Sequence, residues 1–191
     1  MRLILGSASK WRKIILEKAG YTFEVMTADI DEKAIRSENY EELPLLIARA
    51  KADALLLKIV EPSILITSDQ VVVCDGELWE KPKDEEEAKR FMKSYSEGKA
   101  GQTNTAVVVT NTENGKRAEG VDIAKAYFKE IPDKIIEEYI KDGDASQCSG
   151  GFTIDHPLLI PYLDRIEGDN DSIEGLPMKL VERLLKEVQA N

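Results

Sequence analysis

The chain has 191 residues and a formal net charge of −10, from 26 Lys and Arg against 36 Asp and Glu. This length suits one large domain or two tightly joined lobes around a sizeable core. The acidic balance argues against a nucleic-acid backbone or an anionic membrane surface as the main partner. One small anionic ligand in a locally basic pocket remains compatible with it.

In chain order, the apolar pattern alternates between strands and helices. The expected elements are a strand at 3–5, a helix at 11–19, a strand at 21–25, a loop at 29–32, a long helix at 41–59, β segments at 64–66 and 71–73, a helix at 84–95, strands at 106–109 and 121–128 joined through a turn at 114–115, a helix at 132–141, an extended segment at 158–166 and a helix at 176–188. Ser9 is expected to cap the first helix, with Ile14 and Ile15 facing inward. The sequence therefore predicts a mixed α/β fold.

The cysteines and the N-terminal segment bear on location. Cys74 and Cys148 are far apart and lack metal-type spacing, so we expect reduced intracellular thiols. The first apolar run is too short for a signal peptide, and no later run approaches the length that spans a membrane. We therefore expect a soluble, cytoplasmic protein.

The junction at 6–9, between the first strand and the first helix, has the features of an anion site. Free backbone N–H groups and the helix dipole favour a negative ligand there, and Ser7, Ser9 and Arg12 can add donors. A well-capped helix without a ligand explains the same pattern. The glycine-rich fingerprints of dinucleotide and P-loop sites are absent from the sequence.

Two lysines have neighbours that could direct them toward a ligand. Lys51 lies among small residues on the long helix, and Lys81 precedes Pro82, which restricts the backbone before it to an extended form. Taken alone, each lysine fits a solvated surface side chain at least as well.

Acidic residues offer a candidate metal site. Asp29, Asp31 and Glu32, together with Asp69, could supply oxygen ligands to Mg²⁺ or Mn²⁺, although an acidic chain contains many such clusters. Asp69 differs from the others because it follows a buried strand directly, and the C-terminal end of a strand in an α/β sheet is a typical place for a catalytic group. His156, the only histidine, has no neighbours that support nucleophilic catalysis and is interpreted as structural or solvent-facing.

Six short blocks match, in order, the signatures of one family. They are residues 6–12 (GSASKWR), 29–32 (DIDE), 50–52 (AKA), 68–72 (SDQVV), 80–82 (EKP) and 175–177 (GLP). Together they resemble the Maf-like nucleotide pyrophosphatases, whose opening signature is SASPRR, and the resemblance covers essentially the whole chain. It implies a single domain over 1–191 with a long twisted mixed sheet, flanking helices and a central cleft, as in inosine triphosphatases.

The resemblance also implies a reaction, which is cleavage of nucleoside triphosphates between the α and β phosphates to give a monophosphate and pyrophosphate. Asp69 matches the general base, and Glu32 matches an acidic residue near a divalent cation, Mg²⁺ or Mn²⁺, which Asp69 would also bind. The groups expected around the phosphates are Ser7, Ser9, Arg12, Lys51 and Lys81. Such chemistry needs charge neutralisation and positioning more than a covalent nucleophile. A homodimer is also expected.

Substrate preference is expected to depend on Trp11, Gln70 and Asp155. These resemble the Trp, Gln and Glu of the family branch that acts on 7-methyl-GTP, whereas the branch that acts on dTTP and UTP has Arg, Thr and Gln. Trp11 could stack on a cationic methylated purine, or it could simply pack inward beside Ile14 and Ile15. The alternatives are a pyrimidine pyrophosphatase and a non-catalytic nucleotide-binding regulator of cell division.

Overall fold

The computed structural model describes residues 1–190. Its elements are β1 (Arg2–Leu5), α1 (Lys10–Lys18), β2 (Glu24–Val25), the 3₁₀ helix η1 (Glu32–Ala34), α2 (Glu42–Leu56), β3 (Ser63–Cys74), β4 (Glu77–Trp79), α3 (Glu85–Ser96), β5 (Gly101–Asn111), β6 (Arg117–Phe128), α4 (Asp133–Asp142), the 3₁₀ helices η2 (Asp144–Gln147), η3 (Ser149–Gly151) and η4 (Ile160–Tyr162), β7 (Leu163–Glu167), α5 (Asn170–Glu174) and α6 (Met178–Gln189).

The strands form a seven-stranded sheet in the order β2-β1-β3-β5-β6-β7, with β4 also paired to β3. β1 pairs in parallel with both β2 and β3, while β3 with β4 and β6 with β7 are antiparallel. The sheet is therefore mixed, which confirms the predicted α/β class.

The chain divides into two compact units. The first comprises Met1–Gln70, Thr105–Asp122 and the segment from Gly175 onward; the second comprises Val71–Asn104 and Ile123–Glu174. β3, β5 and β6 contribute residues to both units. The single domain expected over 1–191 stays a prediction, as does the central cleft.

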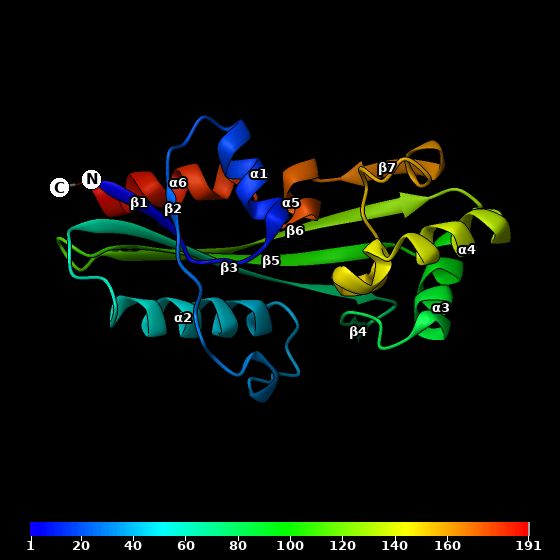
Figure 1. Cartoon of the computed structure of the whole chain (residues 1–191), viewed down its shortest axis with the longest axis horizontal. Coiled ribbons are helices and arrows are strands. Elements are labelled where there is room, and N and C mark those ends of the chain that lie inside the picture. The colour runs from blue at the N-terminus through cyan, green and yellow to red at the C-terminus, as the bar shows by residue number, and fades with distance from the viewer. Residues whose placement is uncertain (191) are drawn as a thin grey trace. The chain divides into compact units, whose positions relative to one another are not determined.

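In the first unit, helices cover both faces of the sheet: α2 lies on one face, and α1 and α6 lie on the other (Figure 1). The alternation of β3 explains this arrangement, because successive side chains of a strand point to opposite faces. Leu65 packs in the cluster that contains the buried side of α2, and Ile64 and Ile66 pack in the cluster built from α1 and α6. The face that a residue of β3 presents can therefore be read from its position.

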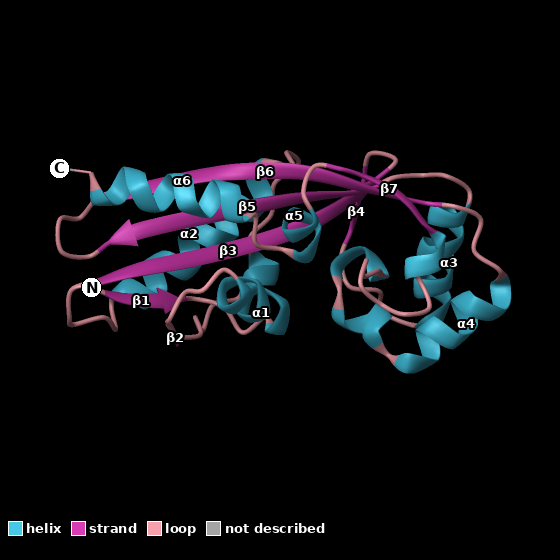
Figure 2. Ribbon diagram, turned by 90° about the horizontal axis from the view of Figure 1, so that it is seen from above, coloured by secondary structure: helices cyan, strands magenta, loops and turns pink. Residues whose placement is uncertain are grey.

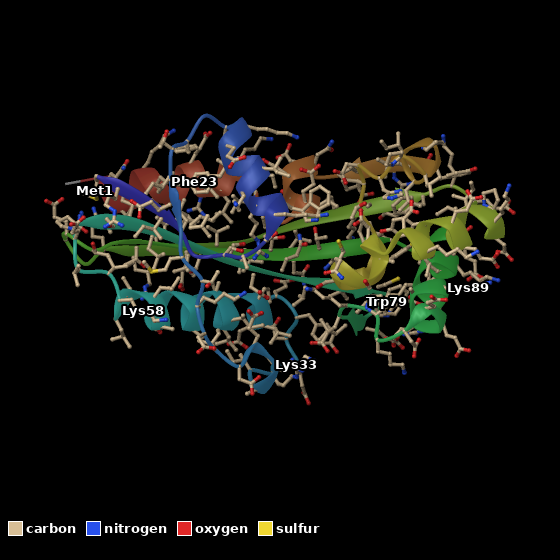
Figure 3. The ribbon with its side chains drawn as sticks, in the orientation of Figure 1. Met1, Phe23, Lys33, Lys58, Trp79 and Lys89 are labelled. Atoms are coloured by element: carbon tan, nitrogen blue, oxygen red, sulfur yellow. The ribbon has the colours of Figure 1, made fainter. Side chains whose placement is uncertain are left out.

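The second unit has an aromatic core. Trp79 stacks on Phe91 with ring centroids 4.1 Å apart, and Tyr95 meets the ring of Phe152 edge-on at 5.0 Å. α3 and α4 pack side by side (Figure 2). Figure 3 labels Trp79, and also Lys89 of α3, whose Nζ lies 2.8 Å from the Glu137 carboxylate of α4.

Four predicted elements differ clearly from those observed. The β segments expected at 64–66 and 71–73 belong to one strand, β3, because the polar residues between them include no Gly or Pro to form a turn. The strand expected at 21–25 is reduced to β2, in which only Glu24 and Val25 pair with β1, opposite Ile4 and Leu5. The segment 158–166 begins in a turn, continues through η4, which contains a proline, and becomes a strand only at β7.

The first helix follows its predicted signals with one exception. The Ser9 side chain accepts a hydrogen bond from the backbone N–H of Arg12, which confirms the cap. Ile15 is buried as expected, but Ile14 is 36% exposed, because neighbouring residues of a helix lie about 100° apart and Ile15 already faces the core. Among residues 1–190, no helix combines the length and the apolar character needed to cross a membrane.

Candidate active site

The predicted general base lies inside β3 and faces α2. Side chains two residues apart in a strand point to the same face of the sheet, so Asp69 faces the same way as Leu65 and Thr67. The hydroxyl of Thr67 donates to the carbonyl oxygen of Ala48 on α2 at 2.8 Å. Asp69 therefore points toward the next turn of α2, where Lys51 lies. The expectation that Asp69 ends a strand is wrong, because β3 continues to Cys74.

Asp69 and Lys51 form a buried ion pair. The ammonium Nζ of Lys51 donates to Oδ1 of Asp69 at 2.7 Å, and each residue is 8% exposed. The flanking Ala48 and Ala52 are fully buried, and their small side chains let α2 approach the sheet closely. The small residues around Lys51 in the sequence thus have a structural purpose, which is to bring an ammonium group to the strand.

Glu32 completes a three-residue cluster. Its Oε1 lies 3.2 Å from Nζ of Lys51, so the ammonium group stands between two carboxylates. Glu32 opens η1, and the preceding Asp31 caps this short helix by accepting hydrogen bonds from the backbone of Lys33 and Ala34. Of the acidic residues expected to gather with Asp69, Glu32 is the one that the structure brings to Lys51, while Asp31 caps η1.

Asp69 and Lys51 lie in a poorly hydrated environment, whereas the side chain of Glu32 is exposed. Burial raises the pKa of Asp69 above its ordinary value, and the positive charges of Lys51 and Arg12 oppose that rise. Burial also lowers the pKa of Arg12, against the attraction of Asp69 and Glu32. Arginine starts from so high a value that its guanidinium stays charged. A carboxylate with a raised pKa, next to an ammonium group, is suited to accept a proton.

Arg12 is a buried link between segments that are far apart in the sequence. Its Nε donates to the carbonyl oxygen of Gly175 at 2.8 Å, and its Nη1 donates to the carbonyl oxygen of Ser68 at 2.9 Å and to Oγ of Ser7 at 3.2 Å. The pairing of β1 with β3 ends at Leu5 and Ile66, so Arg12 binds the part of β3 that β1 no longer reaches. The phosphate-binding role expected of Arg12 stays a prediction.

The two serines of the 6–9 junction stabilise that loop. Oγ of Ser7 accepts from the backbone N–H of Ser9 at 3.2 Å, and Oγ of Ser9 caps α1. An accepting hydroxyl still carries one hydrogen that it can donate to an anion. Both readings of the junction, a capped helix and an anion site, are thus compatible with the same contacts.

Two of the residues expected to set specificity lie in the first unit. Trp11 is half-buried, and Nζ of Lys10 lies 4.6 Å from the centre of its ring. Nε2 of Gln70 donates to Oγ1 of Thr105 at 2.7 Å. Sequence reasoning missed Thr105, because the pairing of neighbours in a sheet cannot be read from one strand. It also assigned no role to Gly175, although this residue belongs to a block that resembles the family.

The remaining candidates lie in the second unit. Lys81 and Asp155 are exposed, and both occupy segments outside its helices and strands. Their expected roles stay predictions. The structural interpretation of His156 agrees with its contacts, since its Nδ1 accepts from the backbone N–H of Leu158 at 3.3 Å and its ring lies edge-on to Tyr139.

The donor set suits a metal that arrives with a ligand. Among residues 1–190, no group of three or more His, Cys, Asp and Glu side chains is arranged to hold a metal ion. Asp69 and Glu32 nevertheless flank one ammonium group. Mg²⁺ is commonly held by one or two protein carboxylates, with waters and phosphate oxygens as its other ligands. The two carboxylates fit that pattern.

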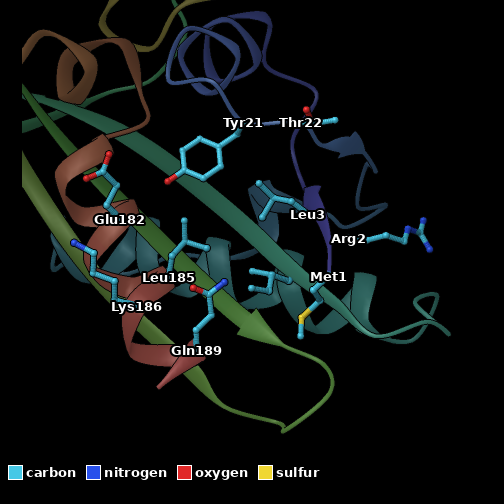
Figure 4. Close-up of a pocket in the computed structure, with 10 residues that line it drawn as sticks. Met1, Arg2, Leu3, Tyr21, Thr22, Glu182, Leu185, Lys186 and Gln189 are labelled. Atoms are coloured by element: carbon cyan, nitrogen blue, oxygen red, sulfur yellow. The ribbon is translucent and has the colours of Figure 1, made fainter. Parts of the chain in front are cut away.

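A separate cavity of about 430 Å³ lies in the first unit beside β1 and α6 (Figure 4). Its lining includes Leu3, Tyr21 and Leu185, with Glu182 and Lys186 at the side of α6. None of the candidate site residues is among the residues that line it. This cavity is therefore not the candidate active site.

Comparison with known proteins identifies the family. A family model described as Maf-like protein matches residues 2–188. A 7-methyl-GTP pyrophosphatase from Dictyostelium discoideum is 45% identical over 97% of this chain and 96% of its own length. A dTTP/UTP pyrophosphatase from Vibrio vulnificus is 36% identical over 97% of this chain and 98% of its own length. A 7-methyl-GTP pyrophosphatase from Idiomarina loihiensis is 36% identical over 92% of this chain and 88% of its own length. The chain belongs to the Maf family.

Proposed function

We propose that this protein is a nucleoside triphosphate pyrophosphatase, which hydrolyses the bond between the α and β phosphates and releases a monophosphate and pyrophosphate. The observation that carries the proposal is the buried pair of Asp69 and Lys51 in a chain of the Maf family. Relatives matched along almost their whole length are named as pyrophosphatases of nucleoside triphosphates.

In the proposed mechanism, ionised Asp69 orients a water molecule and accepts its proton. The water oxygen forms a bond to the α phosphorus, the bond between this phosphorus and the α–β bridging oxygen breaks, and pyrophosphate leaves with the bonding electrons. A positioned general base contributes roughly 10²- to 10⁴-fold in rate. Lys51 pairs with Asp69 before the ligands bind, and in the reaction its ammonium group offsets negative charge that develops on the phosphate oxygens.

The 6–9 junction and the start of α1 supply further positive potential for the phosphates, with Ser7, Ser9 and Arg12 as donors. A divalent cation, Mg²⁺ or Mn²⁺, would be held by Glu32 and Asp69 and would neutralise phosphate charge. For the cation to bind there, the ammonium group of Lys51 has to move from its place between the two carboxylates. We also propose a cytoplasmic location, which the two free thiols support. The homodimer stays a prediction.

We further propose 7-methyl-GTP or another modified nucleotide as the substrate. The similarity to the Dictyostelium 7-methyl-GTP pyrophosphatase supports it, as do Trp11 and Gln70. Because Asp69 and Gln70 are successive residues of β3, they point to opposite faces of the sheet. A nucleotide that uses both has to lie across the edge of β3, beyond the end of β1. The alternative substrates are dTTP and UTP, in line with the Vibrio relative.

The test is pyrophosphate release from 7-methyl-GTP, GTP, UTP and dTTP in the presence of Mg²⁺ or Mn²⁺. The wild type should prefer 7-methyl-GTP, and Asp69→Asn should lower its turnover at least about 100-fold. The control is Asp164→Asn, which changes a partly exposed carboxylate on β7 in the second unit. Undiminished turnover in Asp69→Asn would refute the proposed base. A preference for UTP and dTTP would refute the substrate but keep the reaction.

A further inference from the structure

We infer that Thr105 is a positioning residue that fixes the side-chain amide of Gln70 and so determines which base the enzyme prefers. The inference rests on the proposed function, because it takes Gln70 to contact the base. Thr105 lies on β5, the neighbour of β3, and is fully buried. Its Oγ1 accepts from Nε2 of Gln70 at 2.7 Å.

The alternation of side chains along β3 and β5 explains why Thr105 and Gln70 meet. Val107 and Val109 of β5 pack in the cluster built from α1 and α6, and Thr105 has the same parity. On β3, Ile64 and Ile66 belong to that cluster, and Gln70 has their parity. Thr105 and Gln70 thus share one face of the sheet, the face opposite to Asp69 and Lys51.

A hydroxyl group can donate or accept, so Thr105 alone does not decide which end of the amide faces it. In the structure the amide nitrogen of Gln70 faces Thr105 and donates to it. The amide oxygen lies near Gly175, where an added Cβ atom would be 3.6 Å from Oε1.

An amide held in this way offers a ligand one defined arrangement of donor and acceptor. Nucleobases differ in the donors and acceptors along their edges, so a fixed amide discriminates and a rotating amide does not. Removing the hydroxyl of Thr105 frees the amide to turn, and discrimination should fall. The proton transfer at Asp69 should be unaffected, because Asp69 lies on the other face.

The test compares three substitutions in the full-length protein. Thr105→Val removes the hydroxyl and nearly keeps the shape, Thr105→Ser keeps the hydroxyl, and Thr110→Val is the control. Thr110 is also a buried threonine of β5, and its Oγ1 accepts from Arg117 rather than from Gln70. If Thr105→Val does not fold, Thr105→Cys replaces it, because sulfur is a weak acceptor of similar size.

Two ratios are measured for every variant. One is kcat/KM for 7-methyl-GTP over UTP, and the other is the ratio of dissociation constants, by calorimetry, for non-hydrolysable α,β-methylene analogues of 7-methyl-GTP and UTP. Thr105→Val should lower both ratios about 3- to 10-fold, the effect of one hydrogen bond, while kcat on the better substrate changes less. Thr105→Ser and Thr110→Val should keep the wild-type ratios. In a Gln70→Ala background, Thr105→Val should have no further effect on either ratio.

Several outcomes would overturn the inference. Unchanged ratios in Thr105→Val, with altered ratios in Gln70→Ala, would refute the role of Thr105 and leave the proposed function standing. Equal binding of the two analogues by the wild type, or an equal loss in Thr110→Val, would also refute it. A wild type that releases no pyrophosphate would refute the proposed reaction. In that case a lowered binding ratio in Thr105→Val would still support the positioning role.

Discussion

Replacing Lys51 with methionine should move the acid limb of the pH–rate profile to higher pH. The change keeps the length of the side chain but removes the ammonium group 2.7 Å from Oδ1 of Asp69. Burial already raises the pKa of Asp69, and the charge of Lys51 is the largest influence that opposes the rise. Without that charge, the carboxylate should become ionised, and therefore active as a base, only at a higher pH.

The size of the shift follows from the geometry. A close opposite charge typically moves a carboxyl pKa by about 1 to 3 units, and the pair is well shielded from water, so a shift of about that size is expected. The measurement is kcat/KM for pyrophosphate release across the acid and neutral range, which reports the pKa values of the free enzyme. Glu32→Gln is the matched control, because the negative charge of Glu32 raises the pKa of Asp69 and its removal should move the limb to lower pH.

The protonation of Asp69 should also make the stability of the fold depend on pH. Since the folded-state pKa of Asp69 is raised, the folded protein binds more protons than the unfolded chain between the two pKa values, and stability falls as the pH rises through that window. In Lys51→Met the upper end of this window should move to higher pH. Above that end, the free energy of unfolding should be lower than in the wild type by about 1.4 to 4 kcal/mol. The double variant Lys51→Met with Asp69→Asn should lose this dependence. An acid limb that stays in place or moves down in Lys51→Met would refute the reasoning.

Three further predictions concern other residues. Lys10→Gln removes the ammonium group near the ring of Trp11, so the ring no longer has a cation that competes with the methylated base. Calorimetry should show binding of 7-methyl-GTP strengthened about 2- to 5-fold relative to GTP. An unchanged ratio of the two affinities would contradict this prediction. Gly175→Ala should lower the free energy of unfolding by about 1 to 3 kcal/mol in urea titrations, because φ is +103° there, and equal stability would contradict the strain argument. Burial raises the pKa of the Cys74 thiol to about 11, so little reactive thiolate forms there at neutral pH. A thiol reagent should therefore modify the half-buried Cys148 first. Faster labelling of Cys74 would contradict the expected order.

The elements that could be predicted from the sequence are those with strong local signals. α2 and α6 follow a helical apolar period, and Ser9 caps α1 as expected. The continuity of β3 was missed because polar residues inside an apolar run look like an interruption. They do not interrupt the strand, because the sheet pairs the backbone and leaves side chains free to point to either face.

The candidate site was predictable only in part for a similar reason. The resemblance to the Maf family picks out Asp69, Lys51 and Glu32, and the structure brings these three together. The link between Arg12 and Gly175 joins residues far apart in the chain, and Thr105 meets Gln70 through strand pairing. Contacts of this kind depend on which strands become neighbours, and no local pattern of residues contains that information.

In the proposed enzyme, the alternation of side chains along β3 separates the catalytic residue from the residue that recognises the base. Asp69 faces α2 and its ammonium partner, while Gln70 faces the side of α1, α6 and Thr105, so the proposed base and the proposed recognition residue lie on opposite faces. A substitution at position 70 or 105 can then change the preferred base without disturbing the proton transfer. The same arrangement would let members of one family act on different nucleotides with one catalytic pair. If Thr105→Val and Lys51→Met affected discrimination and the pH profile together, the two faces would not be independent, and this explanation of substrate diversity would be wrong.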